Sequence, residues 1–457
     1  MKKILLFFIV GCLLLSCIDN QISKIIKPAK NMSFKKASWI NNTDVYEVNV
    51  RQYTKEGTFN AFAKELPRLR EMGVSTLWFM PITPIAQQNK KGSLGSPYAT
   101  SDYTAINPEF GTLEDFKALV KLAHSMGFKV IIDWVANHTG WDNVWTKIHP
   151  EYFKKDSSTN NFKVASGMDD IIELDYKNPS LRKAMIDAMQ YWVTETDIDG
   201  YRCDLAFWVE LDFWLEARTE LEKTKTLFWL AECDPLDHPD YYQAFDACYT
   251  WTWMHKTEEF YKQNQDKHLL DAVIHRYDTT GGHDAIPLWF TTNHDENTWN
   301  GTEYEKYGDA AKAFAVFSFT RNGMPLIYSG QELPNLKRLK FFDRDPIEWT
   351  GKYELHDFYK TLLTLHKNNP ALRAGDTAVT TYNLSTTAPD NIVAYLRKNG
   401  DREVLVLLNF SKQSVHCTIK DEIVAGNYKN IFTKSDNVFT PQKSIEMQPW
   451  EYQVYEK

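Results

Sequence analysis

Cysteine is sparse in this sequence, and its spacing argues against two classes of site. Only six cysteines occur among 457 residues. They show neither the close pairs typical of zinc sites nor the density of a disulfide-stapled fold. Two of them lie in an N-terminal apolar segment, and the other four are Cys203, Cys233, Cys248 and Cys417. For these four we expect packing in the protein core.

An excess of positive charge is also absent, as is a hydrophobic run long enough to cross a membrane. The chain has 52 Lys and Arg against 60 Asp and Glu, a formal net charge of −8. Because phosphates attract basic surfaces, this balance argues against a nucleic-acid partner. The apolar run at residues 4–15 is too short to span a bilayer.

The first residues have the features of an export signal. Lys2 and Lys3 precede the apolar run, which ends in Leu14-Leu15-Ser16-Cys17. This ending resembles a bacterial lipobox, in which Cys17 is acylated; the alternative is an ordinary secretory signal with a chance cysteine. We predict a lipoprotein signal peptide over residues 1–17 and a flexible tether over 18–38. A lipid anchor at Cys17 would place the protein in the outer membrane or at the periplasmic face of the envelope.

Short apolar runs alternate with helical patterns along most of the chain, which predicts an α/β fold. Eight such runs followed by helices are most economically an eight-stranded β/α barrel. A doubly wound open sheet is the main alternative, but no Gly-x-Gly-x-x-Gly follows the first run. The predicted strands are residues 45–50, 76–80, 129–133, 198–204, 227–232, 245–249, 287–292 and 325–329.

Two further regions flank this predicted barrel of residues 39–370. Residues 139–177, after the third strand, are too long for an ordinary βα loop, so we expect a small inserted domain over the barrel mouth. After residue 370, strand patterns surround Asn399-Gly400, a strong hairpin signal. Residues 371–457 are therefore predicted to form a C-terminal antiparallel β-sandwich.

Three carboxylates end separate apolar runs: Asp204, Glu232 and Asp295. Strand ends of a parallel barrel meet at one rim, where its active sites lie. Two carboxylates about 5 Å apart suit cleavage of a glycosidic bond with retention of configuration. Arg202 should share a strand face with Asp204 and lower its pKa, whereas like charges should raise the pKa of Glu232. Taken singly, each acid is as readily a structural salt bridge.

The same segments resemble the signatures of the α-amylase superfamily, glycoside hydrolase family 13. Further likeness lies at residues 45–51 and 323–332, so the match covers most of the chain. With the export signal, the sequence is similar to a bacterial lipoprotein α-amylase. The four ordered signatures are Asp133-Trp-Val-Ala-Asn-His138, Gly200-Tyr-Arg-Cys-Asp204, the run ending at Glu232, and Phe290-Thr-Thr-Asn-His-Asp295.

The resemblance implies a role for each matching residue. Asp204 would be the nucleophile, Glu232 the general acid/base and Asp295 the stabiliser of the transition state. Tyr98, in Pro97-Tyr-Ala-Thr-Ser-Asp-Tyr103, matches the aromatic platform beneath the sugar, although a buried loop aromatic is the alternative. The remaining residues expected to contact substrate are His138, Arg202 and His294.

The resemblance also implies a structural calcium ion, although the sequence departs from the family pattern there. The expected ligands are Asn137 and, where the family often has aspartate, Glu173. Calcium accepts varied oxygen ligands, so glutamate is compatible with the site. Many relatives carry Lys-His after the nucleophile, whereas this chain has Leu205-Ala-Phe-Trp208.

We therefore expect a retaining α-glycoside hydrolase of α-amylase type, acting on α-1,4 bonds of starch, glycogen or maltooligosaccharides. Same-class alternatives are a cyclomaltodextrinase or neopullulanase, an α-glucosidase and a glucanotransferase. We see no separate domain before the barrel, which disfavours the first two. A different-class alternative is a glycan-binding lipoprotein that has lost its chemistry, although three intact carboxylates argue against it.

Overall fold

A computed structural model describes residues 34–457 of the chain. Residues 36–457 form one compact unit. The predicted signal peptide with Cys17, and most of the predicted tether, lie outside the described residues. No helix within residues 34–457 is both long and apolar enough to span a membrane.

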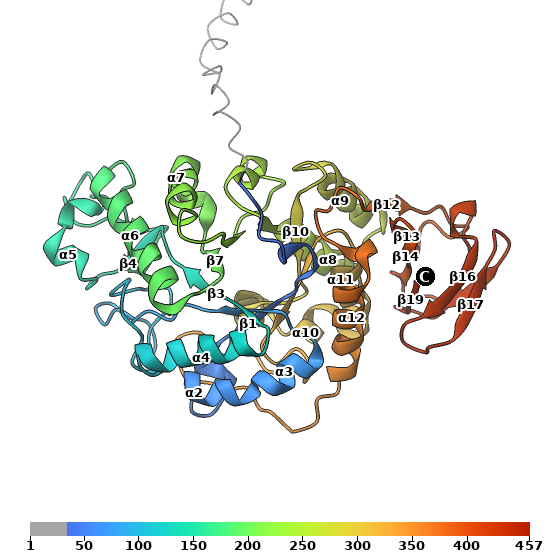
Figure 1. Ribbon diagram of the computed structural model, residues 1–457, viewed down its shortest axis with the longest axis horizontal. Coiled ribbons are helices and arrows are strands. Elements are labelled where there is room, and N and C mark those ends of the chain that lie inside the picture. The colour runs from blue at the N-terminus through green and yellow to red at the C-terminus, as the bar shows by residue number, and fades with distance from the viewer. Residues whose placement is uncertain (1–33) are drawn as a thin grey trace, which may run out of the picture. The chain divides into compact units, whose positions relative to one another are not determined.

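Eight parallel strands close into a barrel (Figure 1), which confirms the predicted fold class. Neighbouring strands follow the order β1-β11-β10-β9-β8-β7-β3-β2, and β2 pairs back with β1. The strands are β1 (Val45–Val48), β2 (Thr76–Phe79), β3 (Lys129–Trp134), β7 (Gly200–Cys203), β8 (Phe228–Ala231), β9 (Ala247–Tyr249), β10 (Ile286–Trp289) and β11 (Met324–Tyr328).

Helices follow the strands and cover the outer face of the barrel. The inner face is buried as well. Every residue of β1, β2, β7, β8, β9, β10 and β11 is buried. This is why these strands appear in the sequence as continuous apolar runs. The helices are α1 (Val50–Tyr53), α2 (Phe59–Phe62), α3 (Leu66–Met72), α4 (Leu113–Ser125), α6 (Pro179–Thr196), α7 (Leu211–Leu221), α8 (Trp251–Gln263), α9 (His268–Thr279), α10 (Glu303–Tyr307), α11 (Ala311–Thr320) and α12 (His356–Asn368).

Local signals set several of these helix boundaries. Pro67 occupies the first turn of α3, and the helical segment after Thr58 is divided into α2, a 3-10 turn and α3. Thr112 and Asp115 cap each other's backbone N–H groups at the start of α4 and so form a capping box.

The long connection after β3 folds into a small sheet of its own. Its three antiparallel strands, in the order β4-β6-β5, are β4 (His138–Gly140), β6 (Met168–Glu173) and β5 (Val164–Ala165). A short helix, α5 (Trp145–Ile148), precedes the second strand. His138 therefore lies both at the end of the barrel strand region and at the start of the inserted sheet.

Antiparallel sheets follow α12, as the hairpin signal predicted. The larger sheet has the order β12-β13-β14-β19-β16-β17, and β15 pairs with β18. The Tyr395 hydroxyl lies 2.6 Å from that of Thr320 in α11, which joins this region to the barrel. The strands are β12 (Thr380–Asn383), β13 (Ile392–Asn399), β14 (Arg402–Asn409), β15 (Val415–Thr418), β16 (Gly426–Asn430), β17 (Asp436–Phe439), β18 (Ser444–Met447) and β19 (Tyr452–Glu456).

Three buried aspartates stand at the N-terminal ends of barrel strands. Asp44 precedes β1 and accepts the N–H of Ser75, at 3.0 Å. Asp199 precedes β7 and accepts the N–H of Val130, and Asp246 precedes β9 and accepts that of Trp229, both at 3.0 Å. Each carboxylate thus ties the start of its strand to the neighbouring strand.

Candidate active site

The opposite end of the barrel holds a cavity of about 540 Å³. Asp204 follows β7 directly and Glu232 follows β8 directly, so both side chains lie at this mouth. Asp295 follows β10 and precedes a π-helical turn, Glu296–Asn300. The lining comprises Lys91, Ser96, Tyr98, His138, Met168, Asp170, Ile171, Asp204, Leu205, Trp208, Glu232, His294, Asp295, Trp299, Phe341 and Phe342.

A single buried guanidinium joins the carboxylates of two adjacent strands. Arg202 Nη1 lies 3.0 Å from Asp204 Oδ1, and Arg202 Nη2 lies 2.8 Å from Glu232 Oε2. Arg202 itself has no exposed surface. Because Asp204 and Glu232 bind the two arms of one planar group, their carboxylates are held close together and face the same cavity.

The same guanidinium reaches a third acid below the mouth. Arg202 Nη1 lies 2.8 Å from Asp133 Oδ1, across the pairing of β3 with β7. The other oxygen of Asp133 accepts from Trp78 Nε1 at 3.2 Å and from the Tyr98 hydroxyl at 3.0 Å. Asp133 therefore orients Arg202 from beneath and does not line the cavity.

Burial dominates the electrostatics of the pair. It raises the pKa of Asp204 well above its usual range; Glu232 raises this pKa further and Arg202 lowers it. Burial also raises the pKa of Glu232, with Arg202 opposing and Asp295 adding. Arg202 lowers the pKa of Asp204 as predicted, but the expected low pKa is wrong, because burial and the neighbouring carboxylates outweigh this one cation. The pair can therefore hold a proton that two separated acids would lose.

His294 forms a second cationic centre on the other side of the mouth. Its Nδ1 lies 2.5 Å from Glu47 Oε1, and its Nε2 lies 3.3 Å from Asp295 Oδ2. Burial alone would lower its pKa, but Asp295 and Glu47 raise the pKa of His294 to about 9. The imidazole is therefore charged at neutral pH and aligns Asp295 at the cavity wall.

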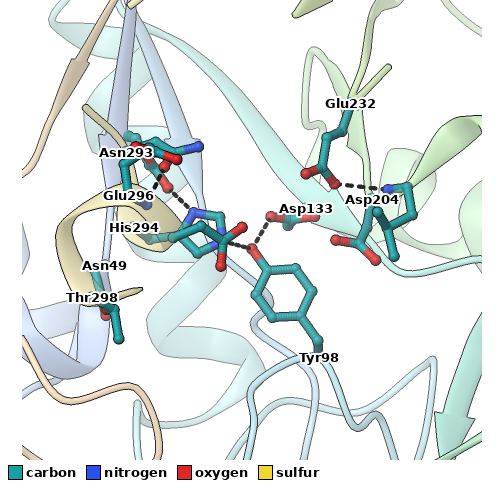
Figure 2. A network of polar contacts seen from close by, with 12 residues as sticks. Asn49, Tyr98, Asp133, Asp204, Glu232, Asn293, His294, Glu296 and Thr298 are labelled. Carbon is teal, nitrogen blue, oxygen red and sulfur yellow. Dashed lines mark hydrogen bonds and ion pairs between the residues drawn. The ribbon is translucent and has the colours of Figure 1, made fainter. Parts of the chain in front are cut away.

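Tyr98 connects these two centres. Its hydroxyl lies 2.8 Å from His294 Nε2 and 3.0 Å from Asp133 Oδ2, and Figure 2 shows it directed toward both. The ring stacks on His294 and on Phe341, with interplanar angles of 16° and 13°. Fixed at both its edge and its face, Tyr98 presents a rigid aromatic surface to the cavity.

His138 contributes a neutral donor to the same cavity. Burial lowers the pKa of His138 to about 4, so the ring is uncharged at neutral pH. Asn137 Nδ2 lies 3.3 Å from His138 Nδ1, which makes that nitrogen the acceptor and leaves the proton on Nε2. Within residues 34–457, Nε2 has no hydrogen-bond partner. The atom itself is buried, although the residue lines the cavity.

Comparison with known proteins identifies the family. The family model of the α-amylase catalytic domain matches residues 31–164 and 147–346, and that of the α-amylase SusG C-terminal domain matches residues 392–452. The chain belongs to the α-amylase family. It is accordingly an amylase-type glycoside hydrolase of family 13.

Individual relatives agree with this assignment over nearly the whole chain. The crystal structure of the maltogenic α-amylase AmyB from Thermotoga neapolitana is 31% identical, with a TM-score of 0.81, covering 91% of this chain and 99% of AmyB. An α-amylase from Lactobacillus plantarum gives 30% and 0.81, covering 92% and 99%. Alpha-amylase 2 of Dictyoglomus thermophilum is 25% identical over 91% of this chain and 76% of its own.

The two residues expected to bind calcium make other contacts in this structure. Glu173 Oε2 lies 3.3 Å from Lys154 Nζ and 3.1 Å from Lys163 Nζ, so two ammonium groups already neutralise it. The Asn137 amide nitrogen is directed to His138. Among residues 34–457, no group of three or more His, Cys, Asp and Glu side chains could hold a metal ion. No step proposed for this α-amylase family member depends on calcium.

Several cavity residues of this α-amylase family member were not anticipated from the sequence. Beneath the cavity, Glu47 sits in a strand that is otherwise apolar or aromatic, and a lone buried carboxylate in such a strand is a usable signal. Trp299 is 52% exposed inside the cavity, whereas exposed tryptophan is rare on ordinary surfaces. Nothing in the sequence pattern marks the others, which are Lys91, Asp170, Trp208, Phe341 and Phe342.

Proposed function

We propose that the protein hydrolyses α-1,4-glucosidic bonds of starch, glycogen or maltooligosaccharides with retention of configuration. Asp204 serves as the nucleophile, Glu232 as the general acid/base and Asp295 as the stabiliser of the transition state. The observation that supports this most directly is the attachment of Asp204 and Glu232 to one guanidinium within one cavity. Retention requires two such carboxylates at close range.

The first chemical step breaks the glycosidic bond. A carboxylate oxygen of Asp204 attacks the anomeric carbon, while the proton of Glu232 passes to the glycosidic oxygen, which leaves with the reducing-side fragment. Glu232 Oε2 is occupied by Arg202 and by the N–H of Leu205, at 2.8 Å in each case. Oε1 is therefore the oxygen that carries the proton.

The second step releases the other fragment. Ionised Glu232 takes a proton from water, and the resulting hydroxide oxygen bonds to the anomeric carbon as the bond to Asp204 breaks. Arg202 balances whichever carboxylate is charged at each stage, because it contacts both. Positive charge developing on the sugar is offset by Asp295, which His294 holds at the wall.

The remaining cavity residues position the sugar. Tyr98 offers a flat apolar surface on which a pyranose ring can stack. The free Nε2 of His138 can donate to a sugar hydroxyl. A sugar has hydroxyl groups that accept hydrogen bonds and an apolar ring face that can stack, so these two contacts suit it.

The stereochemistry of the first product tests this proposal. Proton NMR during hydrolysis of maltoheptaose should show the α anomer of the new reducing end first, followed by mutarotation to the β anomer. Initial release of the β anomer would contradict the covalent intermediate. Failure of the purified protein to release any reducing ends from amylose or maltoheptaose would instead favour the glycan-binding alternative.

We also propose that Cys17 is acylated and anchors the protein to the bacterial envelope. The support is the apolar run ending in Leu-Leu-Ser-Cys, followed by a stretch without strong periodicity. Labelled palmitate should be incorporated in cells that express the full chain, and not when they express Cys17→Ala. Equal labelling of the two would refute the anchor.

A further inference from the structure

The side of the cavity opposite Glu232 is formed by loops that are tied to one another. In the closed barrel, β8 lies across from β1, and β1 is flanked by β2 and β11. The connections after β2 and β11 therefore lie across the mouth from Glu232, and the inserted segment after β3 reaches them through Lys91. We call the segments that meet there the donor rim; it consists of residues 91–95, residues 169–170 and residues 341–343.

Direct contacts link all three segments of the donor rim. Lys91 Nζ lies 2.7 Å from Asp170 Oδ1, and 3.0 Å from Asp169 Oδ1. Leu94 N–H donates to the Phe342 carbonyl at 3.0 Å. Ser93 donates to Asp343 Oδ1 from its N–H at 2.8 Å and from its hydroxyl at 2.6 Å.

A buried cation fixes the donor rim from below. Arg51, 4% exposed, donates from one nitrogen to the carbonyls of Gly95 at 3.0 Å and Phe341 at 3.3 Å. Its other terminal nitrogen lies 3.2 Å from Glu109 Oε1. Gly92, with φ of +62°, is so close to Phe342 that an added Cβ would lie 2.5 Å from the Phe342 Cβ. The rim is thus a packed wall.

The role of Glu232 indicates which part of a bound glucan chain reaches this wall. Glu232 protonates the oxygen of the leaving fragment, so that fragment lies on the β8 side, toward Leu205 and Trp208. The fragment that becomes attached to Asp204 extends the other way, toward Lys91, Asp170 and Phe342, which line the same cavity. The donor end of a bound glucan chain therefore runs into the donor rim.

We infer that the donor rim stops the chain after a few sugar units, so that the enzyme acts from non-reducing ends and releases short products. The inference rests on the proposed function and specifies how its substrate is held. Lys91 and Asp170 offer a charged donor and acceptor to the terminal hydroxyls, and Trp299 offers an exposed ring next to Phe342. A chain that continued in that direction would have to displace the Lys91–Asp170 ion pair.

The test uses maltoheptaose labelled at its reducing end, with its non-reducing end either free or blocked by a benzylidene group. The blocked substrate should be cleaved at least about tenfold more slowly than the free one, a discrimination within reach of one steric clash. Equal rates would overturn the donor rim while leaving the proposed hydrolysis intact. Cleavage of neither substrate would overturn the proposed function and this inference together.

A variant shows whether the rim itself causes the selectivity. Lys91→Ala removes the ties to Asp169 and Asp170 and should raise the blocked-to-free rate ratio by about threefold or more. The matched control is Lys183→Ala, which removes an exposed ion pair to Asp187 within α6 and should leave the ratio unchanged. An unchanged ratio in folded Lys91→Ala, with folding checked by circular dichroism, would refute the role of the rim.

Discussion

The barrel has buried acids at both ends, and the two groups have different roles. At the N-terminal ends, each of Asp44, Asp199 and Asp246 accepts a backbone N–H of the neighbouring strand. At the mouth, Asp204 and Glu232 share a guanidinium and line a cavity. Both groups consist of buried carboxyl groups, so burial of an acid alone does not identify a catalytic residue.

The two groups of acids differ in what their carboxylate oxygen atoms contact. The Asp199 carboxylate is occupied by Lys129, His124 and the backbone of β3. At the mouth, one oxygen of each carboxylate binds Arg202 and the other is left toward the cavity. At the N-terminal ends of the strands the carboxylate oxygens contact other groups of the protein, whereas each acid at the mouth keeps one oxygen for substrate. This is the general division of labour in β/α barrels.

The largest expected effect is loss of turnover in Asp204→Asn. The amide cannot act as the nucleophile, so we expect kcat to fall by at least about 10³-fold. The melting temperature should not fall, because removing one of three acids around Arg202 relieves repulsion among them. Reducing-sugar assays and calorimetry measure the two quantities. The control Asp187→Asn, at an exposed site, should keep full activity; retained activity in Asp204→Asn would contradict the assignment.

An aspartate-to-asparagine substitution at the N-terminal end of the barrel should instead lower stability and leave kcat unchanged. Burial raises the pKa of Asp199, but His124 and Lys225 bring it down from 3.8 to about 2. Such a difference corresponds to roughly 2 kcal/mol of stability at neutral pH. Asp199→Asn should therefore lower the free energy of unfolding in urea by about this amount. The kcat of the folded fraction should not change. A large fall in kcat would show that Asp199 also takes part in catalysis.

A smaller effect is expected for Tyr98→Phe, which removes only a hydroxyl. Asp133 and His294 each lose one hydrogen bond, at a cost of about 1–3 kcal/mol in positioning. We expect kcat/KM on maltoheptaose to fall roughly tenfold, well short of Asp204→Asn. Tyr382→Phe, at an exposed position in β12, is the matched control. If Tyr98→Phe matched wild type, the bridge between Asp133 and His294 would have no part in positioning.

The smallest effect is a change in acid stability. Because the pKa of Asp199 is lower in the folded than in the unfolded protein, its contribution is complete above about pH 4. It is lost as the pH falls toward about 2. The gap in unfolding free energy between wild type and Asp199→Asn should therefore close over that range. A gap that stayed constant from neutral pH to about pH 2 would show that Asp199 acts through packing alone.

The sequence predicted the barrel because each strand is buried on both faces and appears as an apolar run. It also predicted the acids at the mouth, because Asp204 and Glu232 come directly after such runs. It could not assign Glu47, whose partner His294 is 247 positions away. Nor could it predict the high pKa of Asp204, which depends on the burial of this carboxyl group and on the acids that lie near it in space.

Loops were the least predictable part for the same reason. The ties of the donor rim join residues far apart in the chain, such as Ser93 and Asp343. Their partners are common surface residue types with no spacing signal. The contacts of Glu173 with two lysines of the inserted segment likewise have no spacing signal in the sequence.

Trapping the sugar on the enzyme tests the central claim most directly. An activated fluoro-maltosyl fluoride needs no acid for its leaving group, so Glu232→Gln should still react and should be slow to release the product. Mass spectrometry of proteolytic fragments should find the added glycosyl mass on the peptide that contains Asp204, as an ester of that side chain. A glycosyl adduct on any other residue, or steady turnover with no adduct in this variant, would contradict the account.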